Sequence, residues 1–184
     1  LNTGRVTLDA PMLTVQAGSV ELVAGAGSVN MGQDTRLTIS SGGSIRVSAG
    51  EAITLSQIDA PSALVALVAR GGSITDGDVT ESATPDIQAW QLLLEAAEDI
   101  GGSRAAGGMP AGAANALEVA AGTLAARSGF DLRLNETDYV TLDAGVTNTV
   151  TRAAAMLTTP LETTLGGLQS TGGGDIVFSA GSNT

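Results

Sequence analysis

Carboxyl groups are the side chains of this sequence with the greatest capacity for chemistry. The chain carries 19 Asp and Glu against 8 Arg, a formal net charge of −11, and has no His, Cys or Lys. This excludes a Cys or Lys nucleophile, a His general base, a Cys/His zinc site and a disulfide. The acidic balance argues against a nucleic-acid groove or an anionic membrane surface as a partner, because both need clustered basic side chains.

Several acidic residues are expected at strand ends or turns, where a sugar-cleaving enzyme could use a pair of them about 5–10 Å apart. These candidates are Asp131, Glu136, Asp138, Asp143 and Asp175. Such sites usually also recruit basic or aromatic side chains for the sugar, and this chain has no Lys and only 2% aromatic residues. We therefore expect no enzyme and no catalytic residues.

A second acidic group is Asp76-Gly77-Asp78, with Glu81 nearby. Carboxylate oxygens at this spacing could bind Ca²⁺. The calcium-binding repeat of the Gly-Gly-x-Gly-x-Asp type is absent, however, because residues 71–74 lack its third Gly and no Asp recurs. The sequence favours a solvated acidic turn, and we expect no metal and no cofactor.

Threonines recur at the polar positions of the predicted strands. They are Thr7, Thr14, Thr38, Thr54 and Thr141. Thr is β-branched and suits an exposed strand face, so we expect these residues to be structural. A regular Thr ladder that binds ice or a flat partner would need paired outward Thr, and the neighbouring positions here are aliphatic.

Four further features have structural explanations that we favour over functional ones. Asn135-Glu136-Thr137 matches the glycosylation sequon, a three-residue motif that also occurs by chance. Trp90 is expected to plug the core or the end of a coil. Arg127 and Arg133 are expected to pair with neighbouring carboxylates at the surface, each pair contributing about 1 kcal/mol at most.

The elements that must position these residues are short strands. Aliphatic and polar residues alternate with period two, which is the strand signature. The triplets begin at residues 6, 13, 20, 29, 37, 45 and 53, and further triplets cover 132–134, 140–142 and 176–178. Alternate side chains of a strand point to opposite faces, so the aliphatic residues are expected inside and the polar residues outside.

Longer repeats indicate how these strands are arranged. Residues 18–25 match 43–50 at an offset of 25, and residues 117–134 match 161–178 at an offset of 44 without a gap. The second match pairs Leu124 with Leu168. Such offsets fit one and two turns of a unit of about 22–25 residues. Asp76-Gly77 is the only dipeptide of the kind that favours tight hairpins, which disfavours an antiparallel meander.

The predicted fold is therefore all-β: a parallel β-helix (β-solenoid) with about three short strands in each coil of 22–25 residues. Residues 1–184 are expected to form a single β-solenoid segment of a longer repeat protein or polymer. Each strand would pair with its equivalent in the neighbouring coils, and the inward aliphatic residues would stack in columns.

Two stretches depart from this pattern. Residues 86–100 have helical propensity and helical spacing of apolar residues, but they also fit a strand, and we favour the strand because solenoid-like segments lie on both sides. Residues 101–116 are rich in Gly and Ala and have too little apolar bulk to pack, so they are predicted to form a loop insertion.

Three segments resemble the repeats of large bacterial surface exoproteins: GSVELVAGAGSV, GGSIRVSAGEAITL and ALEVAAGTLAARSGFDLRLNETDYVTL. The sequence is similar to filamentous-haemagglutinin-like adhesins and other giant repeat proteins of bacteria. This resemblance implies a right-handed parallel β-helix, secretion to the cell surface, and an adhesive, filament or matrix function. It brings no catalytic residues.

The expected function is a structural or adhesive extracellular rod or filament segment of a bacterial surface protein, without catalysis. The expected partners are the chain itself, by end-to-end stacking or further repeats, and surface glycans or other cells; nucleic acid and membrane insertion are not expected. The alternative is a carbohydrate-binding or carbohydrate-cleaving β-helix protein.

Overall fold

The computed structural model describes residues 4–9, 12–78, 84–102, 116–142, 145–150 and 161–181. The regular elements in these ranges are all strands. The first eight are β1 (Val6–Leu8), β2 (Met12–Ala24), β3 (Val29–Met31), β4 (Arg36–Ala49), β5 (Ile53–Leu55), β6 (Gln57–Ala69), β7 (Ile74–Asp76) and β8 (Ile87–Ala96). The others are β9 (Leu117–Ser128), β10 (Leu132–Glu136), β11 (Thr141–Leu142), β12 (Val146–Val150), β13 (Leu161–Leu165), β14 (Leu168–Ser170) and β15 (Ile176–Ala180).

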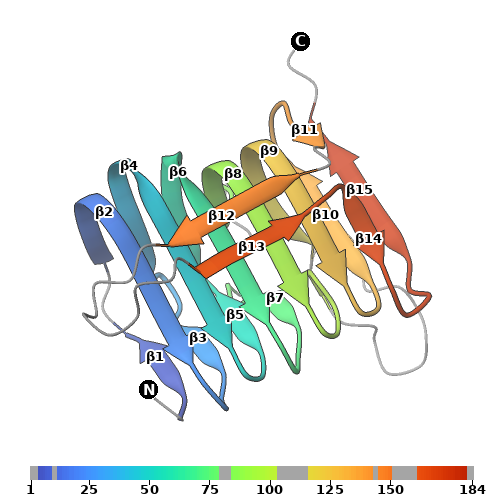
Figure 1. The fold of residues 1–184 in the computed structure, drawn as a ribbon, viewed down its shortest axis with the longest axis horizontal. Coiled ribbons are helices and arrows are strands. Elements are labelled where there is room, and N and C mark those ends of the chain that lie inside the picture. The colour runs from blue at the N-terminus through green and yellow to red at the C-terminus, as the bar shows by residue number, and fades with distance from the viewer. Residues whose placement is uncertain are drawn as a thin grey trace.

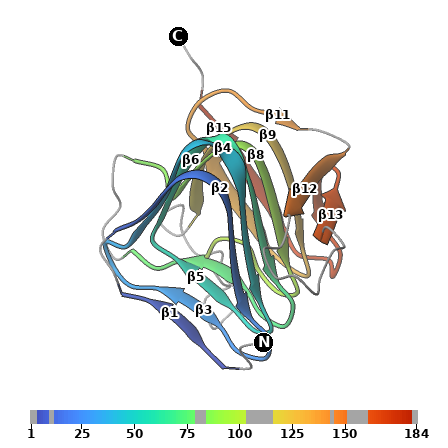
Figure 2. The same cartoon turned by 60° about the vertical axis from the view of Figure 1, so that its left-hand side comes forward.

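The strands form large parallel sheets, as the alternation and the repeats predict. Short strands pair in the order β1-β3-β5-β7, and the larger sheet has the order β15-β10-β9-β8-β6-β4-β2. Val6 pairs with Val29, Val29 with Ile53 and Ile53 with Ile74, so successive partners are 23, 24 and 21 residues apart. Figures 1 and 2 show these strands stacked side by side and curving round a shared interior.

The positions of the predicted strands are confirmed, but several of them merge. The triplets at 13 and 20 both lie in β2, and those at 37 and 45 both lie in β4. Each long strand changes register part-way, between Ala17 and Ser19 against β4, for example. Gly18 and Gly43 adopt positive φ angles of 111° and 112° at this bend, and a Cβ on Gly43 would lie 1.9 Å from the carbonyl oxygen of Gly18. Only glycine fits such a close approach.

The interior is filled by the aliphatic residues that the period-two pattern places inward. Ile45, Ile53 and Leu55 have no exposed surface, and Val29 and Val47 are 1% exposed. In the parallel pairing, equivalent residues of successive coils lie directly beside one another, so that each inward position forms a column along the stack. Burial of each such side chain contributes about 1.5–3 kcal/mol. This shared core is the main source of the stability of the stack.

The segment 86–100 contains a strand, as predicted. β8 pairs with β6 on one side and β9 on the other, and these pairings override its helical propensity. Leu92 and Leu94 point into the core with no exposed surface. Trp90, however, is 57% exposed at the bend of β8, so its expected role as a plug is wrong. Ala89 and Leu92 on either side of the bend are buried, and Trp90 between them points outward.

An antiparallel hairpin interrupts the parallel stack and is the main departure from the sequence prediction. Strands β12 and β13 pair with each other, and Figure 1 shows them lying across the large sheet. Val146 and Leu165 of the hairpin form a second buried cluster with Ala66, Leu93 and Ala125. These three residues pair with one another on adjacent strands and lie on the outer face of the sheet. The hairpin therefore covers an apolar patch that would otherwise be exposed to solvent.

The hairpin also corrects part of the repeat alignment. The offset of 44 is confirmed where Leu132 pairs with Ile176, but its interpretation as two turns is wrong, because β10 and β15 are direct neighbours in the sheet. The offset itself is wrong upstream, because Leu168 pairs with Ala126 rather than with Leu124, and residues 161–165 belong to the hairpin. The offset changes from 42 to 44 after the hairpin, because five residues separate β14 from β15 whereas three separate β9 from β10.

The predicted loop insertion at 101–116 lies largely outside the described residues, of which Gly101, Gly102 and Ala116 belong to it. Gly101 has a φ of 79°, and a Cβ there would lie 2.4 Å from the carbonyl oxygen of Arg133. Only glycine fits this position at the start of the segment. Within the described ranges, no helix is long and apolar enough to cross a membrane.

Candidate functional site

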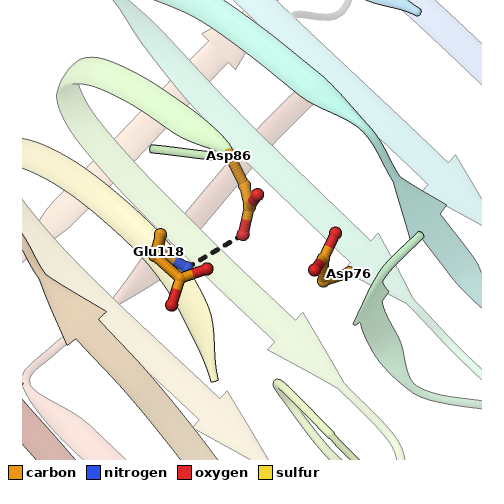
Figure 3. Close-up of side chains that lie close together, drawn as sticks. All are labelled: Asp76, Asp86 and Glu118. Carbon is orange, nitrogen blue, oxygen red and sulfur yellow. Dashed lines mark hydrogen bonds between the residues drawn. The ribbon is translucent and has the colours of Figure 1, made fainter. Parts of the chain in front are cut away.

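Three carboxyl groups from separate passages of the chain meet on one side of the stack. Asp76 ends β7, Asp86 immediately precedes β8, and Glu118 is the second residue of β9. One carboxyl oxygen of each lies within 4.8 Å of the others (Figure 3). The parallel register explains part of this, because Ile87 pairs with Val119 and so brings the preceding residues, Asp86 and Glu118, side by side.

Asp86 is the most perturbed member of this acidic cluster (Asp76, Asp86 and Glu118). It is only 7% exposed, and its Oδ2 accepts a hydrogen bond of 2.9 Å from the backbone N–H of Glu118. Burial raises the pKa of Asp86 from 3.8 to about 8, and repulsion by Asp76, Glu118 and Asp78 adds to this, against the opposing effect of the Glu118 N–H. At neutral pH, Asp86 therefore holds a proton beside two other carboxyl groups.

The turn after β7 brings a fourth acidic residue close. The N–H of Asp78 donates to Oδ1 of Asp76 at 2.8 Å, and the Ser56 hydroxyl donates to Oδ1 of Asp78 at 2.9 Å. Asp76 and Asp78 are both half-buried. The remaining member of the sequence-predicted group, Glu81, lies outside the described residues.

An open pocket of about 330 Å³ adjoins the acidic cluster. Asp78 and Asp86 line it together with Asp34 and Arg36. Carboxyl oxygens gathered in this way are suited to hold a hard cation such as Ca²⁺, and a protonated carboxyl beside ionised ones is suited to donate a proton. The acidic cluster is therefore a candidate both for cation binding and for proton donation.

Asp86 and Glu118 are functional candidates that sequence reasoning missed. Glu118 follows Asp86 by 32 residues, and neither stands in a recognisable motif. Their contact depends on which residues of β8 and β9 pair across residues 101–116. The periodicity of the sequence does not specify this register. Only Asp76 was singled out, through its neighbours Gly77 and Asp78.

The other acidic candidates that the structure describes form two pairs, Asp131 with Asp175 and Glu136 with Asp138. Asp131 has no exposed surface; its Oδ2 lies 3.1 Å from the guanidinium of Arg133, and its Oδ1 accepts the N–H of Asp175 at 3.0 Å. The N–H of Asp131 itself donates to Oδ1 of Asp99 at 2.9 Å. These carboxylates therefore tie consecutive coils together. Asp143 lies outside the described residues.

Glu136 and Asp138 lie together at the end of β10. Glu136 is 1% exposed, whereas Asp138 is exposed. The sequon at 135–137 thus occupies the end of a strand, where Asn135 is half-buried and the Thr137 hydroxyl donates to the carbonyl of Val119 at 3.3 Å.

The predicted arginine pairs are confirmed. Arg127 forms an ion pair with Glu95, and Arg133 forms one with Asp131. The first pair is partly exposed, as expected of a surface ladder. The second is buried, with an Arg133 side chain only 5% exposed, so it is part of the interior rather than of the surface.

The outward threonines do not form a continuous ladder. Thr7, Thr14 and Thr141 are exposed, and Thr38 and Thr54 are half-buried. Asn30 stands between Thr7 and Thr54 in their column. Their placement fits polar strand positions rather than a flat binding face.

Comparison with known proteins finds no matching family model, no similar curated protein and no similar solved structure.

Proposed function

We propose that the chain is a right-handed parallel β-helix that serves as a structural and adhesive rod segment of a bacterial surface protein. Its parallel register and its columns of inward aliphatic residues support the β-helix. The handedness, the bacterial origin and the extracellular location come from the resemblance to surface exoproteins, and they belong to this proposal.

The observation that carries the proposal is apolar exposure on the outermost strands of the stack. Met12 and Leu13 of β2 are 62% and 37% exposed, and Ile176 and Val177 of β15 are 45% and 51% exposed. Leu13 and Ile176 continue core columns, because they pair with Leu37 and Leu132, and both lie on edge strands of the large sheet. Further coils, from the same chain or from a second copy, would bury this surface, as neighbouring units do in repeat proteins.

The composition supports a rod that remains dispersed outside the cell. A net charge of −11 makes neighbouring rods repel one another, and the absence of Cys means that the fold does not depend on thiol–disulfide conditions. Surface glycans or other cells are the proposed adhesion targets. No catalytic step is part of this function.

Electron microscopy of the native source, with antibody against this chain, tests the proposal. Label along thin fibres or long surface projections is the expected result. Label confined to isolated globular particles would contradict it. A glycan array probed with the purified chain then identifies the adhesion target, with a charge-matched unrelated acidic protein as the control.

The alternative function, carbohydrate binding or cleavage, is favoured by one observation: protonated Asp86 lies beside the carboxyl groups of Asp76 and Glu118. A carboxyl kept neutral beside other carboxyl groups is the arrangement of a general acid with its partner. This alternative predicts release of reducing ends from a polysaccharide, lost in Asp86→Asn and retained in the exposed control Glu98→Gln. Absence of any released reducing sugar from a panel of polysaccharides would exclude cleavage of those substrates.

A further inference from the structure

One inward column of the core has a carboxyl group, instead of an aliphatic side chain, at its next-to-last position. Each member pairs with the next in parallel register across β2, β4, β6, β8, β9, β10 and β15. The members are Leu13, Leu37, Ile58, Ile87, Val119, Glu136 and Ala180. Glu136 therefore occupies an interior position beneath the last strand, β15, which forms the edge of the large sheet (Figure 1).

The contacts of the Glu136 carboxyl stabilise its ionised form only weakly. Its Oε1 accepts a hydrogen bond of 3.1 Å from the N–H of Ala121. Its Oε2 is buried and makes no well-aligned hydrogen bond among the described residues; Asp138 is the other polar residue that affects the carboxyl. An ionised carboxylate in this position would be shielded from water and would have fewer hydrogen bonds than a hydrated one.

The charged groups around Glu136 reinforce this effect. Burial raises the pKa of Glu136 from 4.5 to about 7; a hydrogen bond with the Asp138 carboxyl and repulsion by it add to the rise, and the N–H groups of Ala121 and Asp138 partly offset it. On β9, Arg127 is engaged by Glu95 and Glu118 lies in the acidic cluster; on β10, Arg133 is engaged by Asp131. β15 carries no titratable side chain.

β15 is attached to the stack mainly through the strand that carries Glu136. Its five residues pair with β10 in parallel register, and the N–H of Gly181 donates to the backbone carbonyl of Glu136 at 2.7 Å. The residues of β15 are exposed apart from Phe178, which is half-buried. The strand has few other contacts to hold it when its neighbour is disturbed.

We propose that Glu136 is a pH-sensitive latch: its uncharged carboxyl holds β15 on the stack, and its ionisation releases β15 and gives the carboxylate access to water. The outer edge of the large sheet is then β15 in mildly acidic surroundings and β10 in alkaline ones. The latch does not depend on the adhesive role of the rod, so an experiment can refute one of these two proposals without refuting the other.

Hydrogen–deuterium exchange of the full chain, followed by mass spectrometry, tests the latch. Protection factors for a peptide that covers residues 176–181 are measured at pH 5 and pH 8, after correction for the intrinsic exchange rates. A group whose pKa is 4.5 when released and about 7 when latched makes opening on the order of 100-fold more favourable at pH 8 than at pH 5. Peptides from β6 and β8 should stay far more protected than residues 176–181 at both pH values, because core strands open only with global unfolding whereas an edge strand can open locally.

Two variants separate ionisation from packing. Glu136→Gln keeps the acceptor for Ala121 but cannot ionise, and Glu136→Val continues the aliphatic column; both should keep β15 protected at pH 5 and pH 8 alike. The exposed control Glu98→Gln should lose protection as the wild type does. Equal protection of wild-type β15 at the two pH values, or the same loss in Glu136→Gln and Glu136→Val, would overturn the proposal.

Discussion

Replacing Asp86 by Asn should remove a penalty that the wild-type protein carries at alkaline pH. The Asp86 carboxyl is 7% exposed and has a pKa raised from 3.8 to about 8, chiefly by burial. Asn has nearly the same shape and keeps an oxygen that can accept the Glu118 N–H. The substitution therefore changes the ability to ionise more than it changes the packing.

The sign of the effect follows from proton binding. Between pH 3.8 and about 8, the folded protein holds the Asp86 proton and the unfolded chain does not. Because the folded state binds more protons, the free energy of unfolding falls as the pH rises through this window. The stabilisation is complete below pH 3.8 and is lost above about pH 8. Between pH 5 and pH 8, the loss from this group amounts to roughly 4 kcal/mol.

Urea denaturation followed by far-UV circular dichroism at pH 5 and pH 8 measures this loss. The stability of Asp86→Asn relative to wild type should increase by roughly 4 kcal/mol between the two pH values, whereas the exposed control Glu98→Gln should follow the wild type. Parallel curves for wild type and Asp86→Asn at both pH values would refute the account of a buried, protonated Asp86.

Three further substitutions test the packing of the stack by the same denaturation measurement. Gly129→Ala places a Cβ 1.8 Å from a carbonyl oxygen of the neighbouring coil and should destabilise the protein by at least about 2 kcal/mol. Leu92→Ala empties a position with no exposed surface and should cost about 2–5 kcal/mol. Asp131→Ala removes one partner of the buried pair with Arg133 and should cost about 3–5 kcal/mol, more than the double replacement of both by Leu.

Matched controls lie elsewhere in the chain. Gly145→Ala meets no atom within 4 Å and should change stability by under about 0.5 kcal/mol. Leu13→Ala, at a position that is 37% exposed on the outermost part of the stack, should cost less than Leu92→Ala. Equal losses for Leu13→Ala and Leu92→Ala would contradict the assignment of the core.

The period-two pattern was sufficient to predict most of the strands and the inward residues. Ile53-Thr54-Leu55 is typical: Ile53 and Leu55 are fully buried and Thr54 is half-buried on the other face. The pattern works because a strand fixes which face each residue occupies, whatever its partner. The offset of 25 was likewise confirmed, since Val20 pairs with Ile45.

The antiparallel hairpin could not be predicted in the same way. Residues 146–150 and 161–165 have aliphatic residues only at their ends, and such a pattern does not specify whether a strand pairs in parallel or antiparallel. The deciding feature is the apolar outer face at Ala66, Leu93 and Ala125, which needs a cover. That face becomes evident only when the coils are in register.

The acidic sites differ in how much of them the sequence contains. Glu136 continues the inward alternation of Leu132 and Leu134, so extending the pattern by two residues would have placed a carboxyl in the core. The contact between Asp86 and Glu118 depends on the register across an insertion, and the sequence has no signal for it. Local periodicity therefore predicts which residues are buried. Predicting contacts between neighbouring strands also requires the register in which those strands pair.

Cysteine cross-linking tests the in-register parallel stack most directly, because the chain has no Cys of its own. Asn30 pairs with Thr54, and Thr54 pairs with Thr75, each on the outer face of a short strand. In-register neighbours about 4.8 Å apart can form a disulfide. Asn30→Cys with Thr54→Cys, and Thr54→Cys with Thr75→Cys, should therefore oxidise readily within the monomer, while Asn30→Cys with Thr75→Cys, two coils apart, should not. Efficient bonding of the distant pair, or failure of both neighbouring pairs, would contradict the stack on which the rod, the acidic cluster and the latch depend.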